Sequence, residues 1–200
     1  MADLVRRTGI TAPQIEALAT AGVIDCFGLS RRQALWEAGR AAEERPERFA
    51  GVTAVGPPPT LPGMSDDEIT IADLWATGIT TGKHPIQHLR QQLQADGILS
   101  AKELRTAPAN TRVRVAGVVA HRQRPATASG VTFMNLEDET GMINVIISIG
   151  CWNRHRKTAS DSGALIIRGR LERADNVTNL IAEHLQRLPL TAPTRSRNFR

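Results

Sequence analysis

The spacing of apolar residues along the chain changes from a helical period to a strand period. Up to residue 110, apolar residues recur every three or four positions, as on one face of an α-helix. Residues 2–40 predict a helix, a glycine-containing turn and a second helix. Pro13 suits a first helical turn, Gly22 ends the first helix, and the second helix follows Ser30.

A proline-rich segment separates this region from a second helical one. Residues 41–64 contain five prolines and little periodicity, which predicts a linker. Residues 65–110 predict a helical connector. Two S-x-x-E capping boxes, at Ser65 and Ser100, mark helix starts within it.

From Thr111 onward, apolar and polar residues alternate with the two-residue period of β-strands. Five strands are expected, with a short helix or irregular cross-over at 151–160 between the third and the fourth. This order is that of an OB-fold barrel. The sequence therefore predicts an α+β protein: an N-terminal helical region, a linker, the connector, a five-stranded OB-fold β-barrel at 111–190 and a basic tail at 191–200. The strands are expected at 112–124, 131–137, 142–148, 164–174 and 178–188.

Charge is distributed unevenly between the two halves. Residues 1–110 carry 11 Lys and Arg against 13 Asp and Glu, whereas residues 111–200 carry 14 against 7. Twenty-two of the 25 basic residues are arginines, whose guanidinium groups suit phosphates and stack on bases. A basic barrel region indicates a polyanionic partner such as nucleic acid. A genomic preference for arginine codons is the alternative explanation.

Phe133 is the aromatic residue best placed to contact such a partner. Strand alternation directs Met134 and Leu136 into the barrel, which leaves Phe133 outside. Asn135 and Asn144 share that outer face. OB-folds bind oligonucleotides on strands 2 and 3, where an exposed ring stacks on bases. Alternatively, Phe133 packs beneath the neighbouring helices. Basic side chains predicted to frame a groove for single-stranded nucleic acid are Arg112, Arg114, His121, Arg122, Arg124, Arg154, Arg168 and Arg170.

No catalytic or cofactor site is recognisable. His84 and His88 could face one way on a helix, but the further ligands that zinc needs are missing. The DETG sequence at Asp138–Gly141 predicts a tight turn fixed by an aspartate side chain and a glycine at positive φ. There is no glycine-rich phosphate-binding loop. No metal, cofactor or small-molecule substrate is expected.

The expected location is the cytoplasm. The cysteines, Cys26 and Cys151, stand alone, which fits free thiols in a reducing compartment. The first residues do not resemble a signal peptide. No apolar run approaches the roughly 18 residues of a membrane span, so no membrane partner is expected.

Four segments carry a family resemblance: QIEALATAGVIDCFGLSRRQALW at 14–36, LPGMSDDEITIADLWATGITTGKHPIQHLR at 61–90, AGVVAHRQRPATASGVTFMNLEDETGMINVIIS at 116–148 and RSRNFR at 195–200. On these segments, the whole chain resembles the C-terminal part of bacterial C-family DNA polymerase α subunits, above all their error-prone branch. The first segment is similar to the second half of the family's helix-hairpin-helix region, so residues 1–40 are expected to be a partial helix-hairpin-helix. The second contains the Gly-x-His-Pro element that precedes the OB domain.

The resemblance implies error-prone, damage-induced DNA synthesis for full-length relatives. Their polymerase domains have no counterpart in these 200 residues, so the chain is expected to be a C-terminal fragment without polymerase activity of its own. The implied partners are single-stranded or primed DNA and mutasome accessory proteins that lead to the sliding clamp. Two alternatives remain open: a module that docks those accessory proteins, and an RNA- or tRNA-binding OB protein, because anticodon-binding OB domains share the F-x-x-L-x-D-x-T-G pattern.

Overall fold

The chain divides into a helical unit, Met1–Gly82, and a unit built around β-strands, Lys83–Arg200, in the computed structural model. Parts of the expected linker at 41–64 and of the expected tail at 191–200 lie outside the described residues. No helix among the described residues is long and apolar enough to cross a membrane. The structure describes residues 1–43, 59–174, 177–192 and 196–199.

The helical unit has a small core of its own. Its elements are α1 (Ala2–Thr8), α2 (Ala12–Thr20), η1 (Asp25–Phe27), α3 (Arg31–Ala41) and α4 (Asp66–Ala76). Ile15 of α2 and Ala34 of α3 are fully buried in this core. Arg31 on α3 holds α4 through an ion pair with Asp73, at 2.6 Å. Contacts therefore join α4, the first part of the expected connector, to the helices before the linker.

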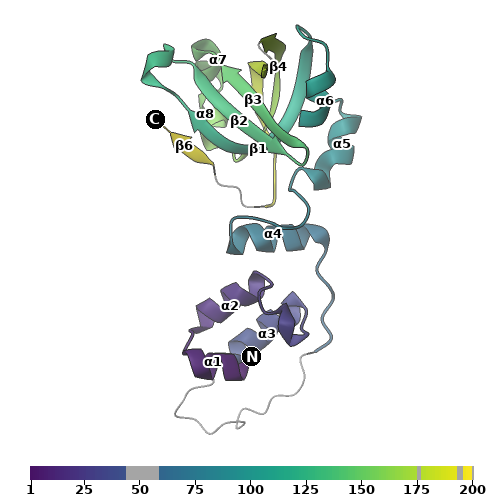
Figure 1. Ribbon diagram of the computed structural model, residues 1–200, viewed down its shortest axis with the longest axis vertical. Coiled ribbons are helices and arrows are strands. Elements are labelled where there is room, and N and C mark those ends of the chain that lie inside the picture. Colours follow the sequence, from purple (N-terminus) through teal and green to yellow (C-terminus); the bar gives the residue numbers. More distant parts are fainter. Residues whose placement is uncertain (44–58, 175–176, 193–195, 200) are drawn as a thin grey trace. The chain divides into compact units, whose positions relative to one another are not determined.

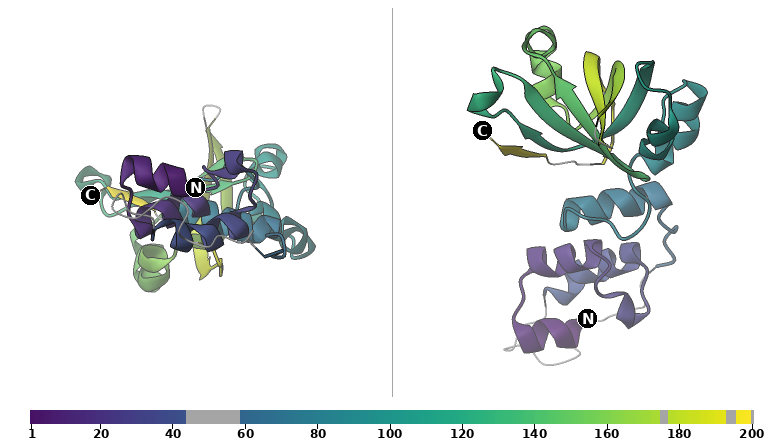
Figure 2. Two further views of the ribbon diagram at one scale, coloured as in Figure 1. Left: turned by 90° about the horizontal axis from the view of Figure 1, so that it is seen from below. Right: turned by 45° about the horizontal axis from the view of Figure 1, so that its top comes forward.

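The second unit is a closed five-stranded barrel in the order expected of an OB-fold (Figures 1 and 2). The hydrogen-bonded order is β2-β3-β5-β4-β1, and β1 pairs back with β2 to close it. The predicted α+β class and barrel are confirmed. The strands are β1 (Arg112–Gln123), β2 (Thr132–Asp138), β3 (Gly141–Ile147), β4 (Ala164–Ala174), β5 (Val177–Arg187) and β6 (Arg197–Phe199).

Short helices flank the barrel. In Figure 1, α5 and α6 lie on one side of the strands, and α7 and α8 lie on the other. Residues Ala101 and Leu104 of α6 and Ala159 of α8 join the barrel core, so both sides help to fill it. The helices of this unit are η2 (Gln87–Leu89), α5 (Arg90–Ala95), α6 (Ala101–Thr106), η3 (Ala126–Ala128), α7 (Ile149–Arg154) and α8 (Arg156–Asp161).

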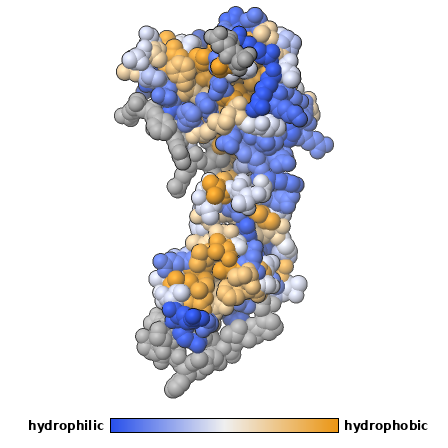
Figure 3. Space-filling view, viewed as in Figure 1, coloured by the Kyte–Doolittle hydropathy of each residue, from blue (hydrophilic) through white to orange (hydrophobic). Residues whose placement is uncertain are grey.

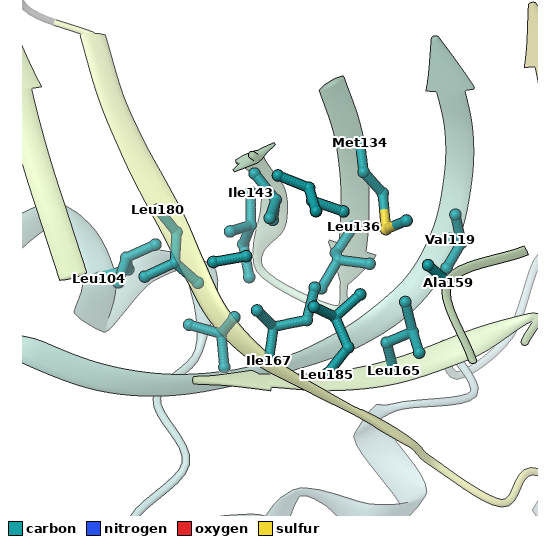
Figure 4. Close-up of a cluster of buried hydrophobic side chains, with 14 of the residues drawn as sticks. Leu104, Val119, Met134, Leu136, Ile143, Ala159, Leu165, Ile167, Leu180 and Leu185 are labelled. Atoms are coloured by element: carbon teal, nitrogen blue, oxygen red, sulfur yellow. The ribbon is translucent and has the colours of Figure 1, made fainter. Parts of the chain in front are cut away.

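Inward side chains fill the barrel as the alternation predicts (Figure 4). Met134 and Leu136 of β2 are fully buried, and Ile143 of β3 is nearly so. They share this core with Ile167 of β4 and Leu180 of β5. Burial of this apolar set stabilises the barrel because each large aliphatic side chain removed from water contributes about 1.5–3 kcal/mol.

The DETG turn between β2 and β3 is confirmed. Asp138 accepts a hydrogen bond from the backbone N–H of Thr140 at 2.7 Å, an Asx-type turn. Gly141 has a φ of 140°, which other residues rarely adopt.

The tail contains a strand that the sequence did not predict. Residues 197–199 form β6, which pairs in parallel with β1 at His121–Gln123. Polar, basic residues carry no strand period, so the alternation gave no signal here.

Gly169 lies where the register between β4 and β5 shifts, and the backbone of β5 is close to it there. A Cβ at this position would lie 2.3 Å from the carbonyl oxygen of Ile181. Gly169→Ala is therefore expected to lower the free energy of unfolding by about 1–3 kcal/mol, measured by urea denaturation. Gly150→Ala is the matched control, because a Cβ there meets only a side-chain nitrogen at 3.9 Å. Equal losses in both variants would contradict the steric explanation.

Candidate nucleic-acid interface

The strand register arranges one row of outward side chains around the barrel. Phe133 on β2 faces Ile146 on β3, which pairs with Ile181 on β5. Ile181 in turn pairs with Arg170 on β4, and Arg170 with Arg112 on β1. Because neighbouring strands lie about 4.8 Å apart, the row is continuous. It has an aromatic end, an aliphatic middle and a basic end, and we call it the Phe133 row.

Phe133 itself is solvent-accessible. Its exposed fraction is 38%, and it stands on the outer face of β2 opposite Gln123 of β1. An exposed ring on a rigid strand can stack on a nucleobase.

Amide side chains form a second row beside the first. Asn135 donates a hydrogen bond from Nδ2 to Oδ1 of Asn144, at 3.3 Å, and Asn144 pairs with Asn179 on β5. Each amide offers both donors and acceptors. The row can therefore contact base edges next to a stacked base.

Carboxylates partly neutralise the basic end of the Phe133 row. The Nε of Arg112 donates to both carboxylate oxygens of Glu183 at 3.1 Å. Arg170 donates to Glu172, also at 3.1 Å. These arginines are exposed, so the ion pairs are weak and can be exchanged for phosphate contacts.

Arg114 and Arg168 line a depression of about 380 Å³ on the outside of β1, β4 and β5. His184 and Gln186, which the sequence did not single out, complete its wall with Ile166. Strict alternation from Leu180 directs residue 184 inward. The irregular register opposite Arg168 and Gly169 turns it outward, so only the pairing of β4 with β5 reveals it.

A second histidine touches this wall. The ring of His155 lies 4.7 Å from that of His184 in an edge-to-face arrangement. Burial, with smaller effects from His184 and Arg154, lowers the pKa of His155 below its usual value. The neutral imidazole is thereby favoured at position 155.

Arg122 lies apart from these exposed groups because it is buried. Its Nε donates to the carbonyl oxygen of Ala159 at 2.7 Å, and its other nitrogens donate to the Ser162 carbonyl and the Ser196 hydroxyl. This guanidinium joins α8 and the C-terminal segment to β1. Its pKa is lowered by burial, which the charge of Asp161 opposes.

The remaining expected residues lie on β1, directly after its end, and on α7. His121 is half-buried and pairs with Asn135 of β2. Arg124 lies over the ring of Trp152, at 5.5 Å from its centroid. Arg154 is exposed at the end of α7. Among the described residues, no group of His, Cys, Asp and Glu side chains could hold a metal ion.

Comparisons with known proteins identify the fold of the barrel and the relatives of the chain. Residues 113–188 match the family model described as an OB-fold nucleic acid binding domain. The chain is 52% identical over 99% of its length to the error-prone DNA polymerase of Mycobacterium bovis, and 48% and 46% identical to those of Nocardia farcinica and Cutibacterium acnes. It spans 18% of the length of each of these relatives.

Solved structures give weaker likenesses. Asparaginyl-tRNA synthetase from Pyrococcus horikoshii is 18% identical with a TM-score of 0.38, covering 48% of this chain and 24% of that one.

Proposed function

We propose that the OB-fold barrel of this chain binds single-stranded DNA. The premise is that the chain is homologous, along nearly its whole length, to a segment of the error-prone DNA polymerases. The observation that carries the proposal is the Phe133 row, in which an exposed ring and an apolar floor lead to two guanidinium groups. Bases stack on the ring, and the arginines contact the backbone. The family model supports nucleic acid, and the named relatives favour DNA over RNA.

In this proposal the barrel holds template for a polymerase that copies damaged DNA. The chain then takes part in replication, damage-induced mutagenesis and translesion repair through binding, with the partial helix-hairpin-helix against duplex backbone. We place it in the cytoplasm, where its cysteines, Cys26 and Cys151, stay as free thiols.

Phe133→Ala tests the proposal. We expect loss of the stacking platform to weaken binding of a labelled oligothymidylate by about 1–3 kcal/mol. The measurement is fluorescence anisotropy on the full chain at two salt concentrations, because phosphate contacts make affinity fall with salt.

Trp75→Ala is the matched control, since Trp75 is an aromatic residue of α4 with an exposed fraction of 67%. The Trp75→Ala variant should bind oligothymidylate with the same affinity as the unmodified chain. If Phe133→Ala binds oligothymidylate as tightly as Trp75→Ala does, the Phe133 row is not the binding site. A parallel titration with RNA of matched sequence decides the RNA-binding alternative, which tighter binding to RNA would favour.

Docking of mutasome accessory proteins is a second proposal. It is favoured by large apolar side chains exposed on the helical unit, where hydrophobic residues gather on the face seen in Figure 3. The large apolar side chains exposed on the helical unit include Val23, Phe27 and Trp36. Co-purification of the chain with accessory proteins after nuclease treatment would support docking, and through it a route to the sliding clamp.

A further inference from the structure

Two neighbouring rows of basic side chains on the barrel differ in how their charge is balanced. In both rows, arginines of β1 and β4 stand directly opposite each other: Arg112 faces Arg170, and Arg114 faces Arg168. Like charges in such positions destabilise a sheet. Glu183 and Glu172 relieve the first pair.

Among the residues that the structure describes, no carboxylate forms an ion pair with the second pair of arginines. Arg114 donates to a backbone carbonyl, that of Asp96, at 3.1 Å. Arg168 makes no hydrogen bond or ion pair within the part of the chain that the structure describes, and its side chain is exposed. The next residue along the row, across β5, is His184. This row therefore brings basic groups from three adjacent strands together, and the depression that they line has no carboxylate among its described lining residues.

The same row lines the 380 Å³ depression. Ile166 gives it an apolar side, and Gln186 adds an amide that can donate hydrogen bonds. Two guanidinium forks, an amide and an imidazole suit a compact anion with several acceptor oxygens. A phosphate group has that chemistry.

We infer that the depression lined by Arg114, Arg168, His184 and Gln186 binds a phosphate group. The phosphate has two possible sources: the backbone of a bound strand, or a free polyphosphate such as pyrophosphate. The register favours the backbone, because the Phe133 row reaches β4 at Arg170, two residues from Arg168. That source rests on the proposed function, whereas phosphate binding as such does not.

Arg168→Gln in the full chain, titrated with two probes, tests the inference. With inorganic pyrophosphate in calorimetry, we expect about tenfold weaker binding, from loss of one charge-assisted hydrogen-bonding group. With oligothymidylate in anisotropy, we expect the slope of log affinity against log salt to fall in magnitude by about 0.7, the value for one phosphate contact on a single strand.

Two further variants sharpen the result. Gln186→Glu places a carboxylate in the depression and should weaken both probes as well. Arg156→Gln removes an exposed arginine of α8 outside the depression and should change neither. Thermal unfolding checks that each variant is folded.

The two titrations distinguish a failure of the phosphate site from a failure of the proposed binding of single-stranded DNA. Weaker binding of both probes supports a backbone phosphate in the depression. Weaker binding of pyrophosphate alone keeps the phosphate site and overturns the backbone as its source. If Arg168→Gln changes neither probe, the inference is wrong, even where Phe133→Ala still weakens oligothymidylate and the proposed function stands. If the unmodified chain fails to bind oligothymidylate, the proposed function fails, and the pyrophosphate titration still decides the site.

Discussion

Asp138→Ala is expected to lower the free energy of unfolding by about 3–5 kcal/mol, the range for breaking a buried, hydrogen-bonded charge. The side chain of Asp138 is fully buried. One oxygen accepts from Arg90 at 3.1 Å and from the backbone N–H of Ala101 at 2.7 Å. The other accepts from Thr140 and Gly141. Its removal leaves the N–H of Ala101 unsatisfied in the core and releases the β2–β3 turn from α6.

Urea denaturation of the full chain measures this loss, and Glu172→Gln is the control. The ion pair of Glu172 with Arg170 is about half exposed on both sides, so its loss should cost less than about 1 kcal/mol. A cost for Asp138→Ala no greater than for the control would show that the turn and α6 are held together by apolar packing alone.

Arg122→Ala is expected to destabilise the barrel by about 2–4 kcal/mol, because it leaves two buried carbonyl groups without their donor. These are the carbonyls of Ala159 and Ser162. Loss of the contact with Ser196 should also loosen β6. Denaturation gives the first effect, and faster amide hydrogen exchange at 197–199 gives the second.

Arg124→Ala is the matched control for Arg122→Ala, because it removes a surface arginine instead of a buried one. Arg124 is exposed, and its contact with the ring of Trp152 contributes about 0.5–1 kcal/mol at such a site. If Arg122→Ala proved as mild as Arg124→Ala, with unchanged exchange at 197–199, Arg122 would not hold the C-terminal segment.

Local sequence signals predicted most of the fold because they act within a few residues. Ser65 and Ser100 begin α4 and α6 through capping boxes with Glu68 and Glu103. The hydrogen bonds from Ser100 hold the pKa of Glu103 below its usual value. The expected strands agree with the observed ones to within one residue at either end. These features depend on side chains close in sequence, so a sequence pattern contains them.

The sequence by itself therefore determined the helices, the strand order of the barrel, the DETG turn and the outward position of Phe133. Tertiary pairing alone decided which basic residues share a surface. A β-bulge between Val119 and His121 shifts the alternation of β1, so Arg122 turns into the protein. The irregularity opposite Arg168 turns His184 outward on β5. The physical reason is that an extra residue in one strand reverses the facing of every side chain after it, and only pairing with the neighbouring strand fixes where it is inserted.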